Sequence, residues 1–316
     1  MAKFRDSTAD SEAIEAGASV RHGAVPPPLG APADGDSDLH DRSIGDIIAE
    51  LRNLSVEQVE KVLQQQRTTG LRFGEAAVAL GYASKDDVLF ALSQQFHYPY
   101  APEEKRSISP ELVALNEPFS YRAESFRALR SQLMMRLFGK GGPNPALAVI
   151  SPDAGDGKTY CASNLAVTLA QLGGRTLLVD ADMRGPRIHE VFNLKNQAGL
   201  SGILSGRSDK QVIRQVAGVS SLFVLPVGTV PPNPLELVER PAFGLLLREL
   251  VSKFDHVVVD TPAAVHGADA SVIAARCGAA LTIARKGASR VSLLKDLVAS
   301  FEGSHVKLAG VVLNEF

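Results

Sequence analysis

Apolar residues in the second half of the chain form short continuous runs, at 146–150, 175–179, 222–225, 256–259, 279–284 and 307–313. Between these runs the apolar residues instead recur every three or four positions, at 158–172, 241–253, 267–276 and 290–301. A further helical stretch, at 122–137, precedes the first run. Strands that alternate with helices are typical of a parallel, doubly wound sheet. We therefore expect an α/β domain over residues 121–316.

Residues 42–103 have a helical pattern that repeats. A shift of 29 residues places Ser55 on Ser84, and it also pairs Ile44 with Phe73, Leu51 with Leu80, Val59 with Val88 and Leu63 with Leu92. Each copy is predicted to form a short helix, a turn and a second helix, with Ser55 or Ser84 as the N-cap. The pattern indicates a small all-helical domain, followed by a linker over residues 104–120.

Composition limits the remaining possibilities. Residues 1–41 are rich in Gly, Pro, Ala, Asp and Ser, which is typical of a disordered arm. The chain opens on polar residues and has no apolar run near 18 residues, so we expect a cytoplasmic protein with no signal peptide. A formal net charge of -2 predicts no bulk attraction to nucleic acid. Cys161 and Cys277 give neither a disulfide framework nor a metal-binding spacing.

The first candidate site follows the run at 146–150. Residues 151–159 form a glycine-rich loop that ends in Gly157-Lys158-Thr159 and leads into a helical stretch. Backbone N–H groups of such a loop close around phosphate oxygens, and the helix N-terminus adds partial positive charge. Lys158 is expected to reach the β- and γ-phosphates and Thr159 to hold Mg²⁺. The nucleotide-binding residues predicted from this loop are Ala154, Gly155, Asp156, Gly157, Lys158, Thr159 and Tyr160; the alternative is a glycine-rich turn with a surface lysine.

Two other apolar runs end in carboxylates. Asp180 and Asp182 follow the run at 175–179, and Asp260 follows the run at 256–259. Ligands of parallel α/β sheets bind at the carboxyl ends of the strands, and Mg²⁺ bound to a nucleotide takes one or two carboxylates. Taken singly, such an Asp is commonly a turn or cap residue. Two of them beside a phosphate loop favour a metal–nucleotide site.

Together, Gly157-Lys158-Thr159, Asp180/Asp182/Arg184 and Asp260-Thr261-Pro262 resemble the motifs of the deviant Walker P-loop NTPases. They resemble more closely the bacterial tyrosine kinases of exopolysaccharide and capsule assembly, over residues 115–316. Pro152 replaces the usual first glycine of the loop. Asp153 stands where the related positioning ATPases carry a lysine, which favours the kinase branch.

The resemblance implies ATP or ADP with Mg²⁺ as ligands. It implies that Lys158 stabilises the transferring phosphoryl group, that Asp180 orients or deprotonates the tyrosine hydroxyl, and that Asp182 and Asp260 hold Mg²⁺ with Thr159. The implied catalytic residues are Lys158, Asp180, Asp182 and Arg184. Asn314 matches an asparagine that contacts adenine in related ATPases, although a plain turn residue is the alternative.

Assembly is also implied by the resemblance. Glu124, Arg127 and Arg130 match a Glu-x-x-Arg-x-x-Arg helix that joins subunits of these kinases into a homo-oligomeric ring; the alternative is a solvated charged face. An integral-membrane chain-length determinant is the implied partner, which would hold the protein at the inner membrane. No nucleic-acid partner is implied.

Two departures bear on catalysis. These kinases often end in a tyrosine cluster, whereas the five tyrosines here are Tyr82, Tyr98, Tyr100, Tyr121 and Tyr160. Asp153 and Asp156 place negative charge beside the phosphates, which should weaken nucleotide affinity unless Mg²⁺ or Arg184 offsets it. A non-catalytic, ATP-switched scaffold and a positioning ATPase therefore remain open.

The helical repeat resembles the cyclic di-GMP-binding N-terminal domain of secretion and pilus ATPases. The residues that this resemblance implies as ligands are Arg42, Gly45, Arg72, Gly74 and Gly81. Arginine suits phosphate and guanine edges, and glycine permits close backbone approach. Ser43 and Arg52 depart from the pattern in the first copy. The alternative is a docking domain that binds no nucleotide.

Overall fold

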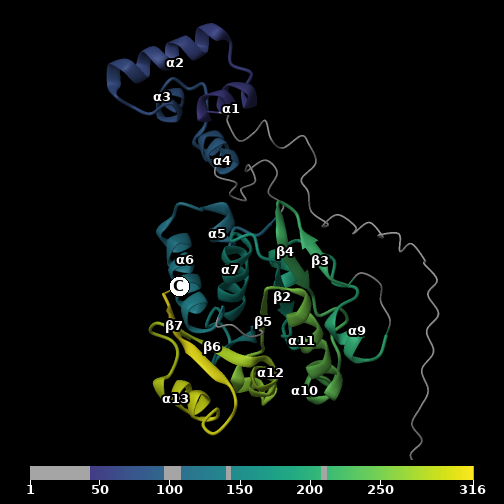
Figure 1. Ribbon diagram of the computed structural model, residues 1–316. Coiled ribbons are helices and arrows are strands. Elements are labelled where there is room, and N and C mark those ends of the chain that lie inside the picture. The colour runs from purple at the N-terminus through teal and green to yellow at the C-terminus, as the bar shows by residue number, and fades with distance from the viewer. Residues whose placement is uncertain (1–42, 96–107, 140–143, 208–211, 316) are drawn as a thin grey trace, which may run out of the picture. The chain divides into compact units, whose positions relative to one another are not determined.

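The computed structural model describes residues 43–95, 108–139, 144–207 and 212–315. The arm predicted over residues 1–41, together with Arg42 and residues 96–107, lies outside these ranges. The described residues form a helical repeat and an α/β domain (Figure 1).

The helical repeat contains the two helix pairs that the 29-residue shift predicts. Its helices are α1 (Ile44–Leu51), α2 (Val56–Thr69), α3 (Phe73–Ala79) and α4 (Lys85–Gln95). Ser55 and Ser84 cap the second helix of each pair as expected, because their hydroxyls accept from the backbone N–H three residues later. The core of the repeat is small and apolar, with Ile48, Val62, Ala77 and Ala91 fully buried.

An ion pair joins the two copies. Arg52 Nε donates to Asp87 Oδ2 at 2.7 Å, and the same carboxylate oxygen accepts the backbone N–H and the hydroxyl of Ser84. Burial raises the pKa of Asp87, but these hydrogen bonds outweigh burial and hold the pKa below its ordinary value. Arg52, which departs from the glycine of the repeat pattern, therefore has a structural task.

The α/β domain is built on a seven-stranded sheet in the order β3-β4-β2-β5-β1-β6-β7. The strands are β1 (Ala146–Ile150), β2 (Thr176–Asp180), β3 (Arg214–Val216), β4 (Val219–Leu225), β5 (His256–Asp260), β6 (Gly278–Arg285) and β7 (Lys307–Asn314). All neighbours pair in parallel except β3 and β4, which are antiparallel. The predicted parallel sheet is therefore confirmed, with one antiparallel edge strand added.

Helices cover both faces of this sheet (Figure 1). One core includes residues of α5 (Val113–Asn116), α6 (Tyr121–Arg136), α7 (Lys158–Ala170) and α8 (Ile188–Val191). The core on the other face includes residues of α9 (Leu200–Leu204), α10 (Pro234–Glu239), α11 (Pro241–Lys253), α12 (Asp269–Cys277) and α13 (Val291–Ala299). Because β1, β2 and β5 are buried on both sides, they are continuous apolar runs.

The linker predicted over residues 104–120 is wrong for its described part. Leu112 and Ala114 are fully buried in the core of the α/β domain. Asn164 of α7 accepts from Ala114 N–H and donates to the carbonyl of Glu111. The apolar sequence Leu112–Leu115 packs against the sheet-covering helices, so residues 108–120 belong to the α/β domain.

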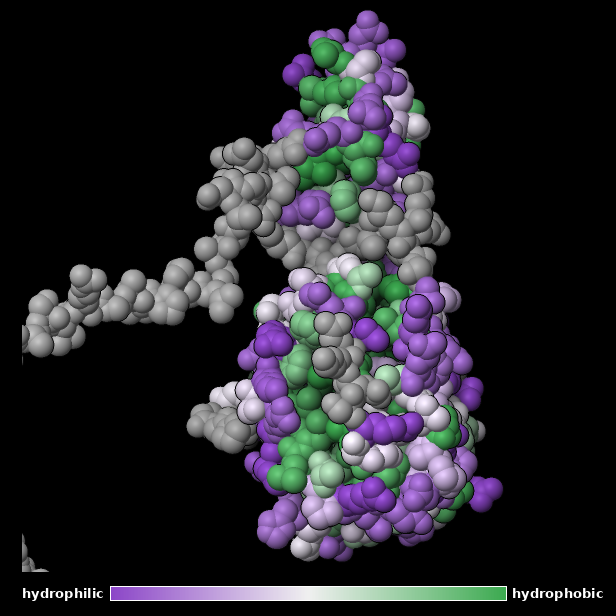
Figure 2. Space-filling view, turned by 90° about the vertical axis from the view of Figure 1, so that its right-hand side faces the viewer, coloured by the Kyte–Doolittle hydropathy of each residue, from purple (hydrophilic) through white to green (hydrophobic). Residues whose placement is uncertain are grey.

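None of the helices among the described residues is long and apolar enough to cross a bilayer. Figure 2 shows a band of hydrophobic residues between hydrophilic ones on the visible face of the α/β domain.

Candidate nucleotide-binding site

The loop between β1 and α7 depends on two glycines. Gly155 and Gly157 have φ values of +80° and +94°, in the left-handed region that favours glycine. A Cβ on Gly157 would lie 2.1 Å from Asn314 Nδ2, so no other residue fits there without movement. Asn314, at the end of β7, donates from Nδ2 to the carbonyl of Asp156 at 2.9 Å. The last strand of the sheet therefore holds the loop in place.

Lys158 is the first residue of α7, and only 7% of its surface is exposed. Its ammonium donates to Ser151 Oγ at 3.1 Å, and Ser151 Oγ in turn donates to the carbonyl of Asp153 at 2.7 Å. The positive charge thus lies against the loop that precedes it. This is the position from which a phosphate held by the loop is neutralised.

The carboxylate of Asp156 is a structural part of the loop. Asp156 Oδ2 accepts from Asp153 N–H at 2.9 Å, and Oδ1 accepts from the Ser289 hydroxyl at 2.6 Å. Only 2% of Asp156 is exposed. We expected this charge to weaken phosphate binding, but its oxygens are already bonded within the protein. Ser289, beyond the end of β6, was not singled out from the sequence.

Asp180 and Asp260 are register partners at the carboxyl ends of the adjacent strands β2 and β5, and both are fully buried. Thr159 Oγ1 donates to Asp260 Oδ2 at 2.6 Å, whereas Asp260 Oδ1 is buried without a hydrogen-bond partner. Burial raises the pKa of Asp260 to about 7, although the Thr159 hydrogen bond acts in the opposite direction. Burial first, and then the neighbouring Asp260, raise the pKa of Asp180 well above its ordinary value.

Asp182 and Arg184 occupy the turn that follows β2. Asp182 Oδ1 accepts the backbone N–H groups of Arg184 and Gly185, at 3.1 and 2.9 Å. The Arg184 guanidinium binds both oxygens of Asp269, at 3.2 and 3.0 Å. Asp269, at the start of α12, is 2% exposed. The Arg184 charge, which we expected to offset the acids of the loop, is therefore paired with Asp269.

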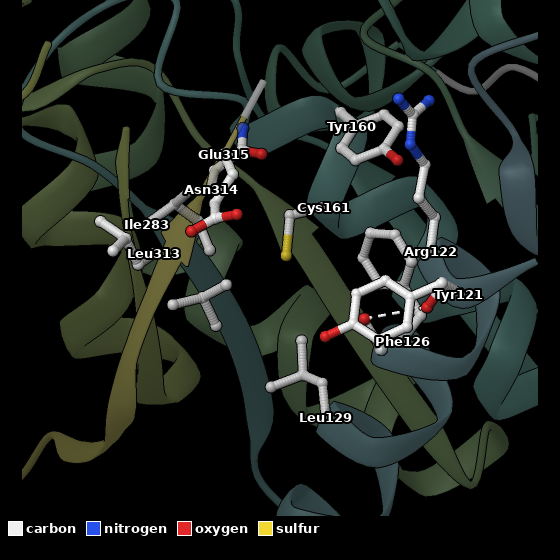
Figure 3. Close-up of a pocket in the computed structure, with 12 residues that line it drawn as sticks. Tyr121, Arg122, Phe126, Leu129, Tyr160, Cys161, Ile283, Leu313, Asn314 and Glu315 are labelled. Atoms are coloured by element: carbon white, nitrogen blue, oxygen red, sulfur yellow. Dashed lines mark hydrogen bonds between the residues drawn. The ribbon is translucent and has the colours of Figure 1, made fainter. Parts of the chain in front are cut away.

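A pocket of about 460 Å³ adjoins the loop (Figure 3). One wall is α6, with Tyr121, Phe126 and Leu129, and the other wall is the end of β7. Tyr160 and Asn314 line it as well, so the pocket opens beside both predicted nucleotide contacts. The sequence predicted these two residues but not the residues of α6, which come close only in the fold.

The charged residues of α6 make bonds within the domain. Arg127 pairs with Glu124 at 2.5 Å and also donates to the carbonyl of Pro118. Arg130 donates to the carbonyl of Thr168 in α7 at 2.8 Å. The Glu124 side chain is 68% exposed, and that of Arg127 is 20% exposed. Glu124 is therefore the most accessible member of this motif for another subunit.

The candidate cyclic di-GMP residues of the helical repeat differ in exposure and in packing. Arg72, at the N-cap of α3, is exposed. Gly74 is a packing residue, because its Cβ would lie 2.7 Å from Val88 Cγ1. Gly81 has a φ of +72°, which a turn after α3 requires. At Gly45 a Cβ would make only ordinary contacts, the shortest of them 3.5 Å to Ser43 Oγ.

The domain between residues 147 and 316 matches the CobQ/CobB/MinD/ParA nucleotide binding domain. Over 216 residues the chain is 33% identical to the putative tyrosine-protein kinase CapB of Staphylococcus aureus, covering 67% of this chain and 92% of CapB. The chain belongs to the bacterial tyrosine kinase family. It is 31% identical to the tyrosine-protein kinase wzc of Salmonella typhimurium over 66% of this chain, but the match spans only 29% of wzc.

Solved structures agree with this membership. The kinase domain of Escherichia coli tyrosine kinase ETK is 31% identical, with a TM-score of 0.62 over 66% of this chain and 81% of that chain. The chimerical protein CapA2B2 is 32% identical, with a TM-score of 0.61 over 71% of this chain and 97% of that chain. The family model begins at residue 147, so it gives no support to the resemblance of the helical repeat to a cyclic di-GMP-binding domain.

Proposed function

We propose that this chain is an ATP-dependent protein-tyrosine kinase that regulates exopolysaccharide chain length and export. The observation that carries the proposal is the contact between Thr159 and Asp260 beside Lys158. It brings a hydroxyl, a carboxylate and an ammonium to one end of a phosphate loop, where a nucleotide and its metal ion meet. Membership in the tyrosine kinase family supports tyrosine as the residue that accepts the phosphoryl group.

The nucleotide lies along the loop in this proposal. Backbone N–H groups of residues 154–160 bind the phosphates, and the Lys158 ammonium exchanges Ser151 for a phosphate oxygen. The ribose and adenine extend past Asn314 and Tyr160 into the pocket beside α6. Burial raises the pKa of the Tyr160 phenol to about 12, so the ring stays neutral beside an anionic ligand.

The oxygens present fit Mg²⁺. Asp260 Oδ1 is a buried acceptor without a partner, and hard oxygen donors are the ligands that Mg²⁺ prefers. We assign the ion to Thr159, Asp260 and Asp182, directly or through water. When bound, Mg²⁺ neutralises charge on the phosphates.

Asp180 requires a revised role. Its carboxylate is fully buried and accepts the backbone N–H groups of Asp182 and Ile188, each at 3.2 Å. Asp180 can orient a tyrosine hydroxyl, as the family resemblance implies, only after the segment from Asp182 to Ile188 moves. Without such a movement, Asp180 acts by fixing the turn that presents Asp182.

Assembly and location complete the proposal. We propose a homo-oligomer that uses the Glu124 face of α6, which is exposed. We also propose that an integral-membrane chain-length determinant recruits the protein to the inner membrane. The resemblance to kinases of exopolysaccharide operons supports both statements.

The test is transfer of phosphate to tyrosine by the full chain. Purified protein is incubated with Mg²⁺ and γ-labelled ATP, with and without a co-purified membrane partner, and phosphotyrosine is detected by antibody and mass spectrometry. Label on tyrosine that disappears in Lys158→Ala supports the proposal. ATP binding without label indicates the non-catalytic scaffold, and phosphate release without labelled tyrosine indicates the positioning ATPase.

Cyclic di-GMP is the ligand that we propose for the helical repeat. The exposed guanidinium of Arg72, at the start of α3, supports it, because arginine binds phosphate by charge-assisted hydrogen bonds. Gly74 and Gly81 lend less support, since each has a structural reason within the repeat. A docking domain without nucleotide is the alternative.

A further inference from the structure

A second hollow lies between α11 and α12, beside the first residues of β1. It has a volume of about 300 Å³. β1 enters the sheet here at Ala146, whereas the phosphate loop follows the other end of the strand, at Ile150. The nucleotide site and this hollow, which we call the α11–α12 groove, are therefore at opposite ends of β1.

Two guanidinium groups converge on the groove. A methyl group built on Gly244 would lie 3.8 Å from Arg248 Nη1 and 3.8 Å from Arg276 Nη1. The two charges therefore approach each other above the same glycine. Arg276 is fixed there, because its other terminal nitrogen donates to the carbonyl of Glu239 at 3.0 Å.

No carboxylate of the described residues forms an ion pair with either guanidinium group. The nearest acid of the same helix, Glu249, is paired with Lys253 at 2.6 Å. Like charges held together raise the local affinity for an anion, and paired guanidinium groups match phosphate oxygens in geometry.

The rest of the groove lining is apolar: Pro145 and Val251 are half-buried and Ala275 is exposed, whereas Leu247 and Cys277 are buried. Burial raises the pKa of the Cys277 thiol, so that the thiol stays neutral. Gly244 leaves the groove open, although glycine inside a helix costs about 1 kcal/mol relative to alanine. A simple inorganic anion makes no use of such an apolar wall, whereas an aromatic ring buries it.

We propose that the α11–α12 groove binds a phosphorylated aromatic side chain, with the phosphate on Arg248 and Arg276 and the ring against the apolar wall. The ligand is a phosphotyrosyl segment of another polypeptide chain in a complex with this one. Such a site lets a phosphorylated tyrosine dock without occupying the nucleotide site.

The test is titration of the full chain into a fluorescein-labelled peptide with one phosphotyrosine and neutral flanking residues, with saturating ADP and Mg²⁺ present. We expect Arg248→Ala to weaken binding by about tenfold or more, since one charge-assisted hydrogen-bonding group is lost. Lys253→Ala, on the same helix but ion-paired to Glu249, is the matched control and should bind as the unaltered protein does. The Arg248 side chain is exposed on α11 and has no hydrogen bond or ion pair within the described part of the chain, so its loss should leave the fold intact.

Further variants and peptides distinguish the contribution of the two arginine charges from that of the apolar wall. Gly244→Leu fills the groove while keeping both arginines, and it should also abolish binding. Circular dichroism verifies that each variant is folded. The unphosphorylated and phosphoserine peptides should bind at least tenfold more weakly. The proposal would be overturned if the unphosphorylated tyrosine peptide bound as tightly as the phosphotyrosine peptide, or if Arg248→Ala did not change the affinity. It would also be overturned if inorganic phosphate competed with the peptide as well as free phosphotyrosine does.

Discussion

Thr159 and Asp260, which are 101 residues apart in the sequence, are joined by a hydrogen bond of 2.6 Å between Oγ1 and Oδ2. The bond connects the first turn of α7 to the carboxyl end of β5. The other carboxylate oxygen, Asp260 Oδ1, is buried without a hydrogen-bond partner. Lys158, whose ammonium donates to Ser151 in the loop, directly precedes Thr159 in the sequence. The fold therefore places the two residues that we propose as metal ligands in direct contact with each other.

The first prediction concerns Lys158. Lys158→Ala should abolish detectable ATP binding in calorimetry, because it removes the charge that neutralises the phosphates. The fold should survive, since among the described residues the ammonium makes a single hydrogen bond, to Ser151. Lys253→Ala removes a lysine from the exposed end of α11 and should leave ATP affinity unchanged. ATP affinity that stays the same in Lys158→Ala would remove this loop from consideration.

The second prediction concerns Asp269 and Arg184. Asp269→Asn weakens the two-bond ion pair that fixes Arg184, whose backbone N–H holds Asp182 Oδ1. We expect kcat for tyrosine phosphorylation to fall about tenfold while KM for ATP changes by less than about twofold, because Asp269 positions a turn and does not contact nucleotide. Arg184→Ala should give the same change, and the double variant should add little. Additive losses of kcat would show that the two residues act separately.

Most strands were predictable because each is long enough to leave a continuous apolar run. β1, β2 and β5 are buried on both faces, so nearly every position in them is apolar and the run is easy to recognise. β3 was missed because Val216 is its single buried residue and its neighbours Arg214 and Gln215 are exposed. An edge strand of three residues has no periodicity to detect.

The site residues that form a motif of consecutive residues were predictable from the sequence. Those that depend on contacts between residues far apart in the sequence were not. Gly157-Lys158-Thr159 is a local motif, and the fold places it as expected between β1 and α7. Asp269 and Ser289 were missed because each acts on a residue 85 or 133 positions away, and nothing beside them in the sequence marks that contact. The α6 wall of the pocket was hidden for the same reason.

The third prediction concerns assembly. Replacing Arg127 and Arg130 with Ala should lower the oligomeric mass without altering ATP affinity. Both arginines also bond within the domain, to the carbonyls of Pro118 and Thr168, so this variant needs a companion that spares the fold. Glu124→Arg is that companion, because the Glu124 side chain is 68% exposed and, among the described residues, forms an ion pair with Arg127 alone. Light scattering that gives one mass for all three proteins would contradict a role of this face in assembly.

The fourth prediction concerns the membrane. Expressed alone, the protein should remain in the supernatant after ultracentrifugation. Co-expression with an integral-membrane chain-length determinant should move it to the membrane pellet, because a protein partner supplies the attachment. High salt that releases the protein would indicate a polar interface, since salt screens exposed charge pairs. Firm pelleting in cells that lack the partner would defeat the idea.

The last prediction concerns the helical repeat. If the full chain binds cyclic di-GMP, the second copy should dominate, because it keeps Arg72, Gly74 and Gly81, whereas Ser43 and Arg52 depart from the pattern in the first copy. A charged hydrogen bond from Arg72 to phosphate is worth roughly 1.5–3 kcal/mol, so Arg72→Ala should weaken binding about tenfold or more. Arg67→Ala, in the last turn of α2, is a matched control that should bind normally. Calorimetry with ADP and Mg²⁺ present keeps the nucleotide site of the α/β domain occupied, so any heat reports on the repeat. A full chain that gives no heat with cyclic di-GMP supports the docking-domain alternative.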